Sequence, residues 1–132
     1  MLLEYNDPYR FFCEYDYSSK WYEKISFEFV NKNHKIWENW NEKKTITIWG
    51  SGQFGTKIIW AAYLLKKRID YVVDSNIDKV NTDILGHKIS AVNLGKLCDE
   101  DLIVVTIYDD DVIRQQLKEV NIEIIYLKDY LH

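Results

Sequence analysis

The stretch T-I-T-I-W-G-S-G-Q-F-G, residues 45–55, constrains the fold of this chain more than any other part of it. A short apolar run ends in three glycines with G-x-G-x-x-G spacing, and apolar residues at helical spacing follow at once. A strand, a glycine turn and a helix in this order are the context that a dinucleotide-binding fingerprint requires. We therefore expect a strand-turn-helix unit that holds a phosphate group at the start of the helix.

Each glycine of the turn has an expected role. Gly50 allows the sharp turn out of the strand, Gly52 lets a phosphate approach the backbone, and Gly55 lets the helix pack close to the strand. The N–H groups and the positive dipole end of the helix then face the pyrophosphate. The predicted phosphate-binding residues of this turn are Gly50, Ser51, Gly52, Gln53, Phe54 and Gly55.

A second apolar run, residues 69–73, ends in Asp74 about twenty residues beyond the turn. An acidic side chain at the end of the second strand is suited to hold the hydroxyl pair of a ribose. Ser75 and Asn76 follow without an arginine for a 2′-phosphate, so NAD-like ligands are favoured over NADP-like ones. The alternative is that the glycines serve only the turn and that Asp74 only caps the next segment.

Strand patterns alternate with helical patterns from residue 45 to the end, which predicts an α/β fold with a Rossmann-like, doubly wound, mostly parallel sheet. The run 102–107 is rich in β-branched residues and indicates a strand buried on both faces. The carboxyl ends of parallel strands meet at one edge, where ligands bind. This edge adds Thr106, a candidate partner for a phosphate or sugar, and Tyr108, a candidate stacking ring; both are also explicable as ordinary loop residues.

Residues 1–44 are expected to form an N-terminal helical, aromatic-rich extension to the nucleotide-binding domain at 45–132, within one compact domain overall. Ser18 and Ser19 can cap a helix, and apolar residues at helical spacing follow them as far as Trp40. The extension either covers its own domain or contacts a protein partner or a second copy of the chain.

Composition excludes several classes of function. The formal charge of −4 over 132 residues argues against nucleic acid as a partner. Cys13 and Cys98 are far apart, with neither metal-ligand spacing nor a disulfide framework, which predicts no metal site and a cytoplasmic location. No apolar run approaches the length of a membrane span, and the N-terminus does not resemble a signal peptide. Three acids at 109–111 are more simply explained by the start of a helix than by a metal.

From residue 45 to residue 131 the sequence resembles small Rossmann-type domains associated with bacterial surface-polysaccharide and nucleotide-sugar enzymes. The resemblance rests on four stretches: I-W-G-S-G-Q-F-G, V-V-D-S-N-I-D-K, L-G-H-K-I-S and D-L-I-V-V-T-I-Y. It implies NAD or a related nucleotide, or a nucleotide-sugar, as the ligand, and a role in building cell-surface glycans. A second resemblance is to the nucleotide-sensing domains of potassium-channel regulators, which share the glycine turn and the acid at the strand end.

Three hypotheses follow. The first is a nucleotide-binding module in surface-polysaccharide biosynthesis. The second is an NAD-dependent nucleotide-sugar epimerase or oxidoreductase subunit, for which His87 is the best acid–base candidate, because a histidine titrates near neutral pH. The third is a protein-interaction domain with a vestigial nucleotide pocket.

Overall fold

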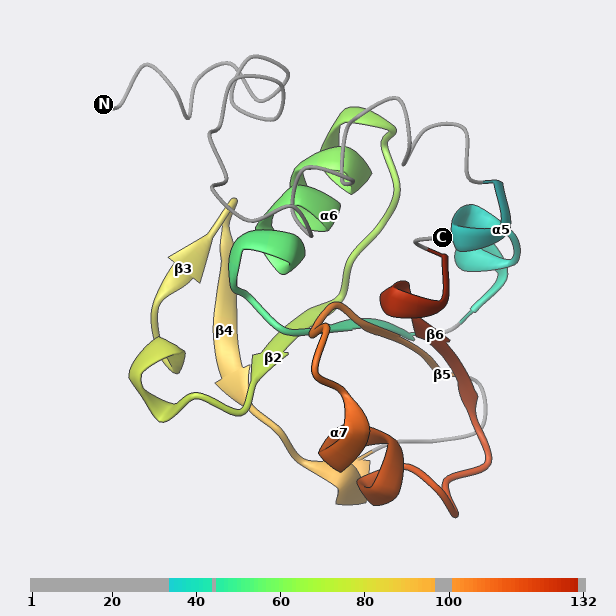
Figure 1. Ribbon diagram of the computed structural model, residues 1–132. Coiled ribbons are helices and arrows are strands. Elements are labelled where there is room, and N and C mark those ends of the chain that lie inside the picture. The colour runs from blue at the N-terminus through green and yellow to red at the C-terminus, as the bar shows by residue number, and fades with distance from the viewer. Residues whose placement is uncertain (1–33, 44, 97–100, 131–132) are drawn as a thin grey trace.

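A computed structural model describes residues 34–43, 45–96 and 101–130, and it shows a mixed α/β fold built on one six-stranded sheet (Figure 1). The strands lie in the order β3-β4-β2-β1-β5-β6, and every neighbouring pair is parallel except the hairpin β3–β4. The α/β class and the mostly parallel sheet are therefore as predicted. The strands are β1 (Thr45–Trp49), β2 (Tyr71–Asp74), β3 (Asp83–Ile84), β4 (His87–Ala91), β5 (Asp101–Val105) and β6 (Glu123–Tyr126).

The α-helices of the described residues are few. Among them only α6 is longer than two turns, and the described part of the crossover from β4 to β5 contains the 3₁₀ turn η3. The α-helices are α5 (His34–Trp37), α6 (Gln53–Leu64) and α7 (Asp111–Gln116); the 3₁₀ turns are η1 (Trp40–Glu42), η2 (Ile77–Lys79), η3 (Leu94–Lys96) and η4 (Leu127–Tyr130).

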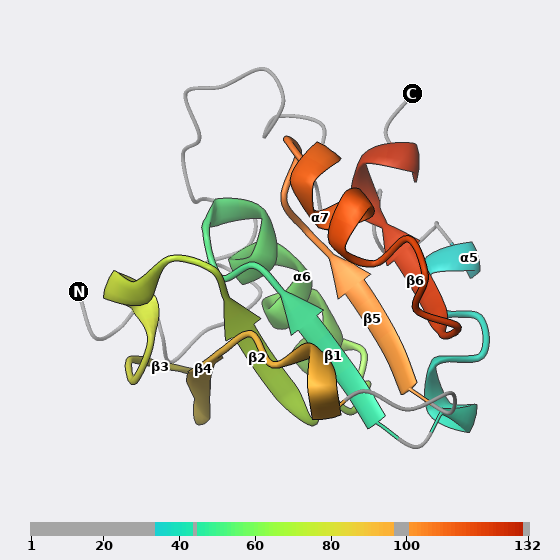
Figure 2. The ribbon, with the colours of Figure 1, turned by 90° about the horizontal axis from the view of Figure 1, so that it is seen from below.

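The strand order reverses at β1. The chain passes from β1 to β2 and β4 on one side, and then returns to place β5 and β6 on the other side of β1. Helices α6 and α7 lie on opposite faces of the sheet, as Figure 2 shows. The loops that leave the carboxyl ends of β1 and β5 therefore lead to opposite faces, a place where open α/β sheets bind ligands.

The core has two parts because successive side chains of a strand point to opposite faces. Ile46 and Ile48 of β1 belong to the cluster on the α6 side of the sheet. Trp49 belongs to the second cluster, with Ile113 and Leu117 on the α7 side. Every residue of β5 is buried, as predicted for a strand covered on both faces.

Helix α6 ends at Leu64. The chain leaves helical geometry at once, with Lys66 at a φ of 58°. The backbone then runs to β2, and the carbonyl of Arg68 accepts a 2.6 Å hydrogen bond from Nε1 of Trp40.

Most of the predicted N-terminal extension lies outside the described residues. Its last part, residues 34–43, forms α5 and η1, and Ile36 and Trp40 are fully buried in the core on the α6 side. No helix within the described ranges combines the length and the apolar character needed to span a bilayer.

Candidate functional site

The glycine turn joins β1 to α6, and two of its glycines are required by packing. Gly50 has a φ of +119°, and a Cβ there would lie 2.4 Å from Oγ1 of Thr106. A Cβ on Gly55 would lie 1.8 Å from the carbonyl oxygen of Gly50, so only glycine lets the helix start this close to the strand end. Gly50 also donates its N–H to the Val73 carbonyl at 2.8 Å, which ties the turn to β2.

Gly52 differs from both of these glycines. Its φ of −74° suits any residue, and an added Cβ would meet no other described atom within 4 Å. Gly52 is the N-cap of α6 and supplies no side chain to accept hydrogen bonds from the first turn; its carbonyl accepts the N–H of Thr56 at 2.8 Å. The first N–H groups of an α-helix have no partner within the helix, and the positive end of the helix dipole favours an anion at such a terminus.

Asp74 lies at the same edge of the sheet and binds the glycine turn directly. Its Oδ2 accepts hydrogen bonds from the backbone N–H of Ser51 at 2.8 Å and from the Ser51 hydroxyl at 2.5 Å. Its Oδ1 accepts the N–H of Asn76 at 2.8 Å. Asp74 is 9% exposed. The carboxylate therefore connects the end of β2 to the turn after β1.

These contacts determine the ionisation of Asp74. Burial by itself would raise its pKa, but the hydrogen bonds from Ser51 and Asn76 and the positive charge of Lys79 outweigh burial and lower the pKa below its ordinary value. The carboxylate is thus fully charged at neutral pH, and its hydrogen bonds to Ser51 are charge-assisted.

This lowered pKa predicts how stability depends on pH. A carboxyl whose pKa is lower in the folded state stabilises the fold above its unfolded pKa of about 3.9, and this contribution is lost as the pH falls through the folded pKa. We expect Asp74→Asn to lower the free energy of unfolding by about 1–2 kcal/mol at pH 7. The difference from the unmodified protein should stay constant down to about pH 4 and shrink below it, as measured by urea denaturation from pH 7 to pH 3. A difference that grows on acidification would contradict this role.

The other predicted residues at this edge also form hydrogen bonds with neighbouring groups of the protein. The Thr106 hydroxyl lies 3.2 Å from the Trp49 carbonyl and 3.0 Å from the Gly50 carbonyl, and its single proton is shared between these two acceptors, so it positions the turn. Ser75 accepts a 3.1 Å hydrogen bond from Nε1 of Trp49, and Oδ1 of Asn76 accepts the N–H of Asp78 at 3.0 Å and caps η2. The structure thus brings the turn, residues 74–76 and Thr106 together.

Tyr108 lies two residues beyond Thr106, and its side chain is 47% exposed. The ammonium nitrogen of Lys128 lies 4.8 Å from the centre of the ring, within cation–π range. A ligand base or ring would therefore share this tyrosine with a lysine.

The chain matches no protein-family model, and comparisons with curated proteins and with solved structures give no significant match. Among the described residues, no group of three or more His, Cys, Asp or Glu side chains is arranged to hold a metal ion.

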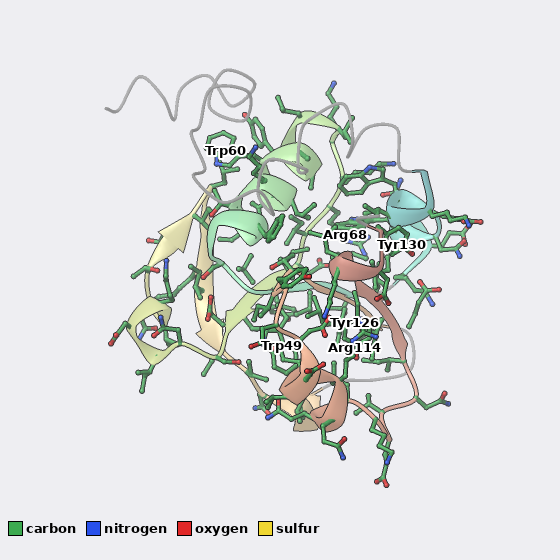
Figure 3. The ribbon with its side chains drawn as sticks, in the orientation of Figure 1. Trp49, Trp60, Arg68, Arg114, Tyr126 and Tyr130 are labelled. Carbon is green, nitrogen blue, oxygen red and sulfur yellow. The ribbon has the colours of Figure 1, made fainter. Side chains whose placement is uncertain are left out.

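A charged cluster near the end of β6 was not anticipated. Nε and Nη2 of Arg114 donate to the two carboxylate oxygens of Asp110 at 2.9 and 3.1 Å, and Nη2 also donates to Asp129 at 2.7 Å. The guanidinium carbon lies 3.9 Å from the centre of the Tyr126 ring, and Figure 3 shows these two side chains together. The hydrogen bond to Asp110 outweighs partial burial and raises the pKa of Arg114 above its ordinary value.

The acids at 109–111 lie at the start of α7, as predicted, with Asp111 in its first turn. Asp110 is the N-cap of α7, but its side chain makes no capping hydrogen bond, because both of its oxygens bind Arg114 one helical turn later. The i,i+4 spacing of an acid and an arginine is the sequence signal that could have revealed the pair.

His87, the acid–base candidate, is the first residue of β4, whereas Asp74 pairs with Ala91, the last residue of that strand. At about 3.3 Å per residue in a strand, four residues separate them by roughly 13 Å. The structure therefore does not bring His87 to the glycine turn.

Proposed function

We propose that the chain is a nucleotide-binding module that holds the phosphate groups of its ligand at Gly52 and the first turn of α6. The observation that carries this proposal is the contrast among the three glycines. Folding explains Gly50 and Gly55, because a side chain at either position would collide with the turn or with Thr106. The packing of the described residues does not explain Gly52, where the conformation and the space that they leave allow a larger residue.

Helix energetics strengthen this contrast. Serine, threonine, aspartate and asparagine stabilise a helix from the N-cap position more than glycine does, because their side chains accept the first N–H groups. Glycine at position 52 supplies no side chain to accept from these donors. A phosphate approaching the bare backbone would satisfy them and gain from the helix dipole.

The strand order supports the same place for the ligand. The proposed site lies where the order reverses between β1 and β5, as in the Rossmann-like winding that we infer for this sheet. The resemblance to domains of nucleotide-sugar enzymes narrows the proposed ligand to NAD or a nucleotide-sugar. It also suggests that the module serves bacterial surface-polysaccharide synthesis. A binding module is favoured over an enzyme subunit because the acid–base candidate lies far from the proposed site. His87 is the first residue of β4, whereas Asp74 pairs with the last residue of that strand.

The test separates binding from folding at the same residue. We expect Gly52→Ser to weaken the binding of NAD⁺ or UDP-glucose at least about tenfold, because the serine hydroxyl caps the helix and its Cβ blocks the phosphate. Stability should stay equal or rise by a few tenths of a kcal/mol. Isothermal titration calorimetry and urea denaturation measure the two effects.

Gly95→Ala is the control, since among the described residues an added Cβ there meets only Oδ1 of Asn93, at 3.4 Å. It should leave binding unchanged. If Gly52→Ser binds both nucleotides as well as the unmodified protein, or if neither nucleotide binds the unmodified protein at millimolar concentration, the proposal fails. The second outcome would favour an interaction domain.

A further inference from the structure

The carboxylate of Asp74 already accepts three hydrogen bonds from the protein, which limits the hydrogen bonds that it could accept from a ligand. A carboxylate has about four acceptor positions, two on each oxygen. Both positions on Oδ2 are used by Ser51, through its N–H and its hydroxyl, and one on Oδ1 is used by the N–H of Asn76. A single position on Oδ1 is left.

A ribose held by an acidic residue commonly presents its 2′- and 3′-hydroxyls to the carboxylate together. Gripping both through Asp74 would require the ligand to displace Ser51 from Oδ2. That displacement would break two charge-assisted hydrogen bonds at a side chain that is 9% exposed. It would also release the turn residue between Gly50 and Gly52, which the phosphate site needs in place.

We propose that Asp74 is a positioning residue, which holds Ser51 and so shapes the glycine turn, and that the site recognises its nucleotide through the phosphates without gripping the ribose diol. The ligand half of this inference, the recognition of the nucleotide, rests on the proposed function. The structural half, the positioning of Ser51 by Asp74, does not. It revises the role that the sequence motif predicts for Asp74. The ligand class that follows is nucleoside diphosphates and their conjugates, with ribose and 2′-deoxyribose accepted alike.

The ligand half is tested with two matched pairs of probes, ADP with 2′-deoxy-ADP and UDP with 2′-deoxy-UDP, titrated into the full chain by calorimetry. We expect the dissociation constants within each pair that binds to agree within about twofold. Losing a hydrogen bond to a charged group costs about 10- to 150-fold in affinity. A tenfold or larger preference for the ribose form would overturn the inference and leave the proposed function standing.

The structural half needs no ligand. Amide hydrogen exchange is measured by NMR at Ser51, whose N–H binds Asp74, and at Asp70, whose N–H binds the Ile46 carbonyl at 2.9 Å near the opposite end of β2. In Asp74→Ala we expect exchange at Ser51 to accelerate at least tenfold beyond any change at Asp70. Asp74→Asn should restore most of the protection, because its amide oxygen can still accept the Ser51 N–H.

Unchanged exchange at Ser51 in Asp74→Ala would overturn the positioning role even if ADP binds. If no nucleotide binds, the proposed function and the ligand half of the inference fail together, and the exchange measurement alone decides the positioning role. The same protection in Asp74→Ala and Asp74→Asn, with both reduced, would also contradict it, since a neutral acceptor would then not replace the carboxylate.

Discussion

Gly55→Ala is expected to lower the free energy of unfolding by about 3–5 kcal/mol, the largest effect that we predict for a single methyl group in this chain. The added Cβ would lie 1.8 Å from the carbonyl oxygen of Gly50 and 2.6 Å from its carbon, both backbone atoms with little freedom to move. The Gly50 carbonyl is also held by the Thr106 hydroxyl at 3.0 Å, so the clash is relieved only by shifting α6 away from β1.

Urea denaturation followed by circular dichroism measures this loss, and Gly52→Ala is the matched variant. The same methyl group at Gly52 meets no other described atom within 4 Å, so its cost should stay below about 1 kcal/mol, the usual difference between glycine and alanine at an N-cap. Equal losses in the two variants would show that the close approach of α6 to the turn is wrong.

Arg114→Met is expected to lower the free energy of unfolding by about 2–4 kcal/mol. The substitution keeps the aliphatic length of the side chain but leaves Asp110, whose side chain is 1% exposed, without the guanidinium that neutralises it. The Arg114 side chain is itself 37% exposed, so the cost comes from the Asp110 charge, which stays buried without its partner. Arg114→Lys should recover only part of the loss, since an ammonium cannot bind both carboxylate oxygens in the same planar arrangement.

The double variant Asp110→Asn with Arg114→Met separates the pair from the rest of the cluster. It should be more stable than Arg114→Met alone, because the buried charge is then gone. Arg68→Met is the more exposed comparison: its Nε lies 3.0 Å from Oδ2 of Asp70, with the two side chains 45% and 30% exposed, and its Nη2 donates to the Lys43 carbonyl. It should cost less than about 1 kcal/mol. If Arg114→Met costs no more than Arg68→Met, the cluster contributes little to stability.

The elements of the sheet were largely predictable, because the signals that define them are local. The buried run of β5 and the strand-turn-helix pattern at the glycines are each indicated by a few consecutive residues. The hairpin of β3 and β4 follows from the turn at Gly86, which has a φ of +81°. The order of the strands and the faces that α6 and α7 cover depend on pairing between residues far apart in the sequence. No short stretch of sequence indicates this pairing.

The partners of the candidate site residues were not predictable to the same degree. The sequence places an acid at the end of β2, but it does not show whether that acid faces a ligand or the chain itself. In the structure, Asp74 binds Ser51, 23 residues away, and Thr106 binds the carbonyl of Gly50, 56 residues away. Such contacts depend on how the loops of neighbouring strands meet, so the motif indicated which residues lie together at this edge better than it indicated what each side chain binds.

The most direct test of the account follows the backbone amides of residues 52–55 in ¹H–¹⁵N correlation spectra as NAD⁺, UDP-glucose or ADP is added to the labelled full chain. We predict that the largest shifts fall on these amides, saturate with a single dissociation constant, and disappear in Gly52→Ser. Shifts confined to other parts of the chain, or an unchanged spectrum at millimolar nucleotide, would contradict a phosphate site at the start of α6.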